Sequence, residues 1–222
     1  MRRLKANAYL GLPVVIAVLI HFTGCGGSTP ANNSLSPAQA QAVSDQVVQA
    51  LTQSLENTFT SNSFPARDTH PRLAAAVANL HPDSAGGCTS TMTGENCNWP
   101  VSLPNFPCGG PSGGTISVTG DIDGSLNNSG NGSINTQLTI TPDNCSVSNL
   151  VLNGDPSIMV GGQINFTGTT PTFPIAFTET GGISYGPNPS GSCQLNVTYT
   201  INSLSSCAAS GTVCGQSVNG RC

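Results

Sequence analysis

Apolar positions in the first third of the chain recur with the spacing of a helix. Gln, Asp and Glu side chains fill the positions between them, so the pattern predicts an amphipathic helix over residues 36–59. Ser36 and Pro37 are typical of a helix start, because serine caps free amides and proline suits the first turn. The apolar stripe consists of Val43, Val47, Leu51, Leu55 and Phe59.

Two segments follow this predicted helix. Residues 71–80 predict a short second helix that Pro82 ends, because three apolar residues recur there at helical spacing: Leu73, Val77 and Leu80. Residues 83–114 contain three cysteines among many prolines and glycines. We expect an irregular segment there, held in place by disulfides.

From Thr115 onward the pattern changes to period two, which predicts β-strands. Between residues 115 and 126 apolar side chains occupy even positions, and Ser, Thr and Asp occupy most odd ones. The run NNSGNG at 127–132 is typical of a turn. The return strand places Ile134, Leu138 and Ile140 on one face. Further alternating or apolar runs lie near 146–153, 157–167, 172–178, 192–202 and 210–215.

These strands follow one another without helical crossovers, which favours an antiparallel β-meander of about six to eight strands over residues 115–222. One face is apolar and the other is rich in Ser, Thr and Asn. A one-faced sheet needs a cover, and the helix at 36–59 is the nearest candidate. The predicted fold is therefore mainly β (α+β), with an N-terminal amphipathic helix packed on a curved antiparallel sheet in one domain, residues 36–222.

Composition limits the class of protein further. Of the 222 residues only 7% are charged and 37% are apolar, with nine cysteines and a net charge of −4. The apolar content excludes a disordered chain driven by charge. The acidic balance excludes the basic footprint of a nucleic-acid-binding protein, so nucleic acid is not an expected partner.

The first 25 residues have the features of a secretion signal. Arg2, Arg3 and Lys5 precede an apolar run from Tyr9 to Phe22. The run covers about 14 residues, fewer than the ~20 that a membrane-spanning helix needs. It ends in the sequence Phe22-Thr23-Gly24-Cys25, without the A-x-A site of ordinary signal peptides.

These four residues resemble the lipobox of bacterial lipoproteins, although leucine is usual where Phe22 stands. The resemblance implies that residues 1–24 are removed, that Cys25 receives acyl chains such as palmitate, and that residues 25–35 form a polar tether. It places the protein in the cell envelope, anchored to the membrane by its N-terminal lipid. The family's retention rule uses Asp after the cysteine, so Gly26 favours the outer membrane. A signal anchor with a buried structural cysteine is the alternative.

Removal of the signal would sharpen the charge balance. Arg67, Arg72 and Arg221 would face ten acidic residues, giving a side-chain net charge of −7 without any lysine. Such a chain has no positive groove for nucleic acid or anionic lipid.

The eight cysteines other than Cys25 predict four disulfides in an exported protein. Their spacings do not resemble those of zinc ligands, so we expect no metal site. Sequence does not choose among the 105 possible pairings, and the local loops Cys88–Cys97 and Cys207–Cys214 are two candidates. The eight are Cys88, Cys97, Cys108, Cys145, Cys193, Cys207, Cys214 and Cys222.

Three patterns resemble parts of catalytic or metal-binding sites, but each lacks residues that such a site needs. Ser184 lies in a G-x-S-x-G match, but no histidine follows it. Asp121 and Asp123 could belong to a calcium loop or a pair of catalytic carboxyls, yet the alternation favours a solvated strand face. His70 and His81 flank the predicted second helix as solvated end residues. We therefore expect no catalytic residue and no cofactor.

Together these observations predict a lipid-anchored cell-envelope protein that acts as a non-enzymatic binding or structural module for an unidentified protein or ligand partner. One alternative is a carrier of apolar ligands, with a cavity between helix and sheet. Another is an envelope hydrolase, for which the expected set of acid, base and nucleophile is missing.

Overall fold

The computed structural model describes residues 35–59, 88–154, 157–168, 170–187 and 189–222, which belong to one compact unit from Asn33 to Cys222. These residues form one helix and eleven strands: α1 (Pro37–Phe59), β1 (Cys88–Thr91), β2 (Gly94–Pro107), β3 (Thr115–Asn127), β4 (Gly132–Asp143), β5 (Cys145–Val147), β6 (Leu150–Asn153), β7 (Ile158–Thr167), β8 (Thr170–Gly186), β9 (Gly191–Ser203), β10 (Ser206–Val213) and β11 (Gln216–Gly220).

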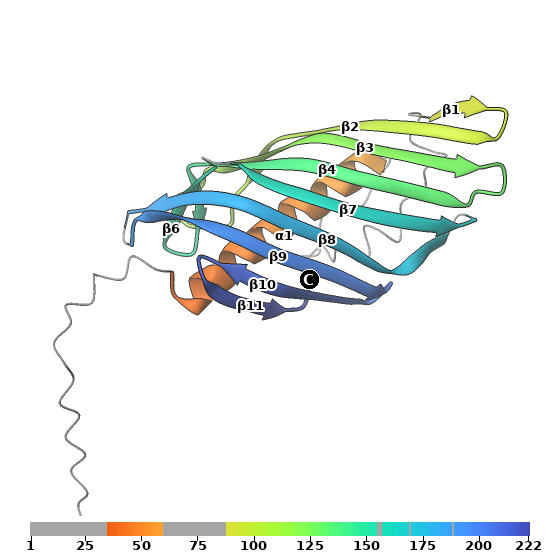
Figure 1. Ribbon diagram of the computed structural model, residues 1–222. Coiled ribbons are helices and arrows are strands. Elements are labelled where there is room, and N and C mark those ends of the chain that lie inside the picture. Colours follow the sequence, from red (N-terminus) through yellow and green to blue (C-terminus); the bar gives the residue numbers. More distant parts are fainter. Residues whose placement is uncertain (1–34, 60–87, 155–156, 169, 188) are drawn as a thin grey trace, which may run out of the picture. The chain divides into compact units, whose positions relative to one another are not determined.

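The eleven strands form one antiparallel sheet (Figure 1). Its order is β1-β2-β3-β4-β7-β8-β9-β10-β11, and the short β5–β6 hairpin branches off and joins β8 through β6. The prediction of a mainly antiparallel β-protein with an N-terminal helix is therefore confirmed. The expected number of strands, six to eight, was wrong, since the described residues form eleven, nine of them from Thr115 onward.

The expectation of an irregular segment at 83–114 was wrong, because two regular strands, β1 and β2, lie within it. In β2 the buried side chains Cys97, Trp99 and Val101 alternate with exposed ones, as a half-buried strand requires. Its prolines obscured this pattern. They are tolerated because β1 pairs with β2 only as far as Cys97, so among the described residues the rest of β2 forms a sheet edge.

The prediction of a helix over 36–59 is confirmed by α1. Its start is a reciprocal capping box, in which the Gln39 amide N–H donates to Ser36 Oγ at 3.3 Å and the Ser36 N–H donates to Gln39 Oε1 at 2.9 Å. The predicted helix at 71–80 lies outside the described residues. Within the described ranges, no helix has both the length and the apolar character needed to cross a membrane.

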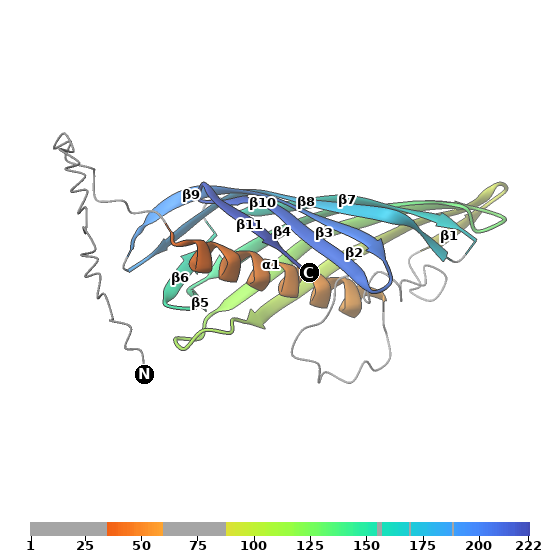
Figure 2. The same cartoon turned by 90° about the horizontal axis from the view of Figure 1, so that it is seen from below.

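α1 approaches strands near both ends of the strand order. Its backbone lies close to β2 and β3, to β10 and β11, and to β5, and Figure 2 shows it along one face of the sheet. Because β2 and β11 lie near opposite edges, the helix crosses the strands obliquely from one edge region to the other (Figure 1). Four residues of the apolar stripe are fully buried within a core that they share with the inward side chains of the strands: Val43, Val47, Leu51 and Leu55.

Four disulfides cross-link this unit, as the cysteine count predicts: Cys88–Cys97, Cys108–Cys145, Cys193–Cys214 and Cys207–Cys222. Of the two candidate local loops, Cys88–Cys97 forms and Cys207–Cys214 was wrong. The strand register explains the difference. The β10–β11 pairing continues from Ala209↔Gly220 toward Cys207 and Cys222, while the Cys214 N–H donates to Gln194 O at 2.9 Å, next to Cys193.

We predict that Gly120→Ala, in the middle of β3, costs about 2 kcal/mol of stability. Its φ of 144° suits glycine, and an added Cβ would lie 2.2 Å from the Gln137 carbonyl oxygen on β4. Gly161→Ala is the matched control, because there the nearest atom, Thr136 O, is 3.9 Å away. Urea denaturation followed by circular dichroism should separate the two. Equal stability of the two variants would contradict the steric explanation.

Candidate functional site

Asp121 and Asp123 lie on an extended strand, not in a loop. Both are exposed on β3, with buried Ile122 between them, and the Asn98 side-chain amide donates to Asp123 Oδ1 at 2.6 Å. A calcium loop wraps its oxygen ligands around one point, whereas these two carboxylates project from a sheet surface. Their position is that of a solvated strand face, as the alternation predicts.

Ser184 lies inside β8, between Ile183 and Tyr185. Its hydroxyl donates to the Asn153 carbonyl oxygen at 3.3 Å and thereby links β8 to β6. A nucleophile elbow needs a sharp turn from a strand into a helix. The G-x-S-x-G match is therefore part of a regular strand pairing.

One group of potential metal ligands occurs among the described residues. The side-chain ligand atoms of Cys88, Glu95 and Cys97 lie within 4.8 Å of one another. The two sulfur atoms form a disulfide, however, and metals bind the thiolate form of cysteine. Three other residues that the sequence singled out lie outside the described residues: Cys25, His70 and His81.

The structure brings one acidic side chain into the core, Glu179 of β8. It continues the inward alternation of Ile175 and Phe177, and it is 0% exposed. Every other acidic residue in the described ranges is at least partly exposed. Across the sheet its neighbours are Val160 on β7 and Val197 on β9, both apolar.

Glu179 belongs to a chain of hydrogen bonds that joins the sheet to the helix. The Tyr199 hydroxyl of β9 donates to Glu179 Oε2 at 2.5 Å. Ser44 Oγ of α1 lies 3.1 Å from the same Tyr199 oxygen. Because a phenol has one proton and Tyr199 uses it on Glu179, Ser44 is the donor in the second bond. Ser44 and Tyr199 are both buried.

The described structure compensates a charge on Glu179 only through the hydrogen bond from Tyr199. Its Oε1 is buried without a hydrogen-bond partner there, and the one basic side chain of the described residues, Arg221, is exposed. Burial raises the pKa of Glu179 to about 7, and the bond from Tyr199 opposes that rise. Burial, and then the charge of Glu179, raise the pKa of Tyr199 well above its usual value. The carboxyl is therefore a proton-binding group near neutral pH.

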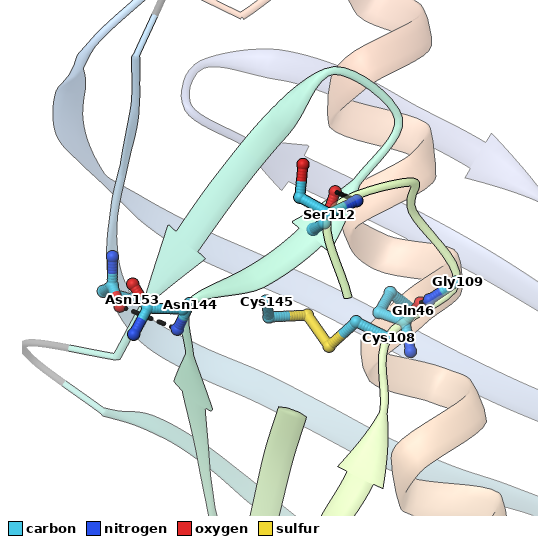
Figure 3. The surroundings of a disulfide bond; sticks show 8 residues. Gln46, Cys108, Gly109, Ser112, Asn144, Cys145 and Asn153 are labelled. Atoms are coloured by element: carbon cyan, nitrogen blue, oxygen red, sulfur yellow. Dashed lines mark hydrogen bonds between the residues drawn. A yellow bond between two sulfur atoms is a disulfide. The ribbon is translucent and has the colours of Figure 1, made fainter. Parts of the chain in front are cut away.

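A second polar contact links α1 to the sheet beside a disulfide. Gln46 Oε1 accepts the Gly109 N–H at 3.1 Å, next to the Cys108–Cys145 bridge (Figure 3). Gly109 belongs to the connection between β2 and β3, and Cys145 begins β5. The Gln39 side-chain amide also donates to Asn149 Oδ1, in the turn between β5 and β6, at 2.8 Å. The helix is thus held by polar contacts at three places.

Sequence reasoning did not single out Ser44, Tyr199 or Glu179 as a site. A partial signal existed, because Phe173, Ile175 and Phe177 alternate and the next inward position is Glu179. The alternation could have placed this carboxyl inside, but its partners come from other elements. Comparison of the chain with family models, with curated proteins and with solved structures gives no match.

Proposed function

We propose that the protein is a lipid-anchored component of the bacterial cell envelope that acts as a non-enzymatic binding or structural module. The observation that carries this proposal is the use of the cysteines. Four disulfides take up all eight cysteines other than Cys25, so Cys25 has no cysteine partner left in the chain. This is the condition that lipid attachment at the lipobox-like sequence requires, and Gly26 favours the outer membrane.

The disulfides also support an exported protein. Bridges of this kind persist in oxidising compartments such as the periplasm and the cell surface. The short polar segment 25–35 would lead from the lipid to the folded unit. We further infer that α1 is the cover that the apolar face of the sheet needs, since its buried stripe lies within the same core.

The outward face of the sheet supports a binding or structural role. Strands β7, β8, β9 and β10 contain one charged residue, Glu179, which is buried. Their outer face is neutral and rich in hydroxyl and amide groups that can bond to a polar partner. One row across the sheet consists of Thr119, Thr139, Met159, Thr180, Asn196 and Thr212.

The positions of the candidate catalytic residues favour a non-enzymatic role. Asp121 and Asp123 lie on an open surface, Ser184 is bonded to a backbone carbonyl within a strand, and Glu179 is sealed in the core. Catalysis requires a nucleophile or an acid–base pair that meets substrate in one place. A hydrolytic activity that is lost in Asp121→Asn or Ser184→Ala would contradict this part of the proposal.

We predict that Cys25→Ser moves most of the protein from the membrane fraction to the soluble fraction of its host cells. Serine has no thiol, so it cannot accept the lipid thioether. Cell fractionation with immunoblotting measures the shift, and mass spectrometry of the mature N-terminus should find acyl chains on the wild type alone. Ser28→Ala, three residues farther along, is the control and should stay membrane-bound. A Cys25→Ser variant that remains in the membrane would support a signal anchor instead.

A further inference from the structure

We propose that Ser44, Tyr199 and Glu179 form a proton-dependent latch, which holds α1 on the sheet while the Glu179 carboxyl is protonated and releases α1 when that carboxyl ionises. This inference concerns the state of the folded unit and goes beyond the proposed envelope function. It rests on the hydrogen-bond chain between helix and sheet and on the apolar surroundings of the carboxyl.

Ser44 is the buried hydroxyl through which α1 bonds to the sheet. Two other buried hydroxyls of the helix are used within it, because Thr52 Oγ1 donates to Val48 O at 2.7 Å and Ser54 Oγ donates to Leu51 O at 2.8 Å. Ser44 instead bonds to Tyr199, and through it to Glu179. A change at the carboxyl is therefore transmitted to one defined point of the helix.

The groups that face Glu179 provide little compensation for a negative charge. From β9 comes the Tyr199 hydroxyl, and from β7 the apolar side chain of Val160. From α1 come Ser44 and, at its exposed neighbouring position, Asp45, whose negative charge disfavours ionisation of Tyr199. No described cation lies inside the core. An ionised Glu179 would hold its charge with a single hydrogen bond, which is costly at a buried position.

Water can reach Oε1 in two ways, and lifting α1 is the easier one. β8 is paired with β7 on one side and with β9 on the other, so removing it breaks two ladders of backbone hydrogen bonds. α1 makes its backbone hydrogen bonds within itself and can leave without breaking either ladder. Lifting α1 breaks its side-chain hydrogen bonds to Tyr199, Gly109 and Asn149 and its apolar packing, but no sheet ladder. Such partial opening of one cooperative unit is a common motion of folded proteins.

The direction of the pH effect follows from the pKa in each state. With α1 seated, the pKa of Glu179 is about 7, and with α1 released the carboxyl meets water and returns toward its ordinary value of 4.5. The opening equilibrium therefore rises about tenfold per pH unit between these two values and levels off above about 7. Release exposes the buried stripe of α1, which includes Val43, Val47 and Leu51.

Amide hydrogen exchange of the whole mature protein, corrected for intrinsic rates, tests the latch at pH 5, 6, 7 and 8. We expect protection of the α1 amides to fall roughly 70-fold between pH 5 and pH 8, the factor that the two pKa values imply. It should stay below the protection of β8 and β9 at every pH, because α1 opens before the sheet. Equal protection of α1 and β8 throughout would overturn the proposal.

Three variants identify the group responsible. Glu179→Gln should remove the pH dependence of α1 exchange, while Asp123→Asn, an exposed carboxylate on β3, should keep the wild-type profile. Ser44→Ala should lower α1 protection about fivefold at all pH values, the effect of one lost hydrogen bond. If α1 exchange in the wild type is independent of pH while β8 exchange is not, Glu179 meets water only on global unfolding and the latch does not exist. That comparison needs no variant to fold.

Discussion

Replacing Glu179 by glutamine should raise the free energy of unfolding at pH 8 by about 3 kcal/mol and make it nearly independent of pH between 5 and 7. The wild-type carboxyl has a pKa raised from 4.5 to about 7 in the folded state. Between these values the folded protein binds a proton that the unfolded chain has lost, so stability falls as pH rises. Each pKa unit corresponds to about 1.4 kcal/mol.

Glutamine is a suitable replacement because it keeps the size of the side chain and can still accept the bond from Tyr199. At pH 5 the free energies of unfolding of the two proteins should agree within about 1 kcal/mol. The wild-type carboxyl is then protonated in the folded state, so it buries an unpaired O–H donor just as glutamine buries an unpaired amide donor. Urea denaturation at pH 5, 6, 7 and 8, with the disulfides intact, measures the difference. Asp123→Asn is the control and should leave the profile unchanged. Parallel profiles for Glu179→Gln and the wild type would show that Glu179 is not the buried titrating group.

Removing the Cys108–Cys145 bridge by a double alanine substitution should lower stability by about 4 kcal/mol, more than the ~2.5 kcal/mol expected for Cys88–Cys97. The first bridge spans 37 residues and the second spans 9, and a longer loop restricts the unfolded chain more. Cys145 is also fully buried, whereas Cys88 is partly exposed.

The Cys108–Cys145 bridge has a structural consequence that adds to the entropic one. It lies beside the Gly109 N–H that donates to Gln46 of α1 (Figure 3), so its loss would also loosen the support of the helix. Denaturant midpoints of the two double-alanine variants, measured side by side, give the comparison. A smaller effect for Cys108–Cys145 than for Cys88–Cys97 would show that loop length does not control stabilisation here.

Local patterns in the sequence were enough to predict most of the secondary structure. The stripe from Val43 to Phe59 and the Ser36 cap predict α1, because helix periodicity and capping depend on residues a few positions apart. Alternation likewise predicts the strands after Thr115. The pattern failed for β2, where Pro100 and its neighbouring prolines resemble a loop unless the strand is known to lie at a sheet edge.

The candidate site was harder to predict than the strands. Alternation along β8 points Glu179 inward, but a carboxyl at an inward position could equally have met a cation or solvent. Its hydrogen-bond partner Tyr199 lies 20 residues farther along the chain, on β9. Tyr199 in turn bonds to Ser44, which is 155 residues away from it in the sequence. These residues lie close together because of the register of the sheet and the position of α1 against it.

The sequence by itself determined the period of α1 and of the strands after Thr115, the start of α1 and the even number of cysteines apart from Cys25. These features depend on neighbouring residues or on composition. Only the tertiary structure decided which cysteines pair, that β2 beyond Cys97 lies at a sheet edge, and that Glu179 is enclosed with Tyr199 and Ser44. The physical reason is that burial, register and pKa are properties of long-range contacts. A side chain acquires them from the segments that fold around it.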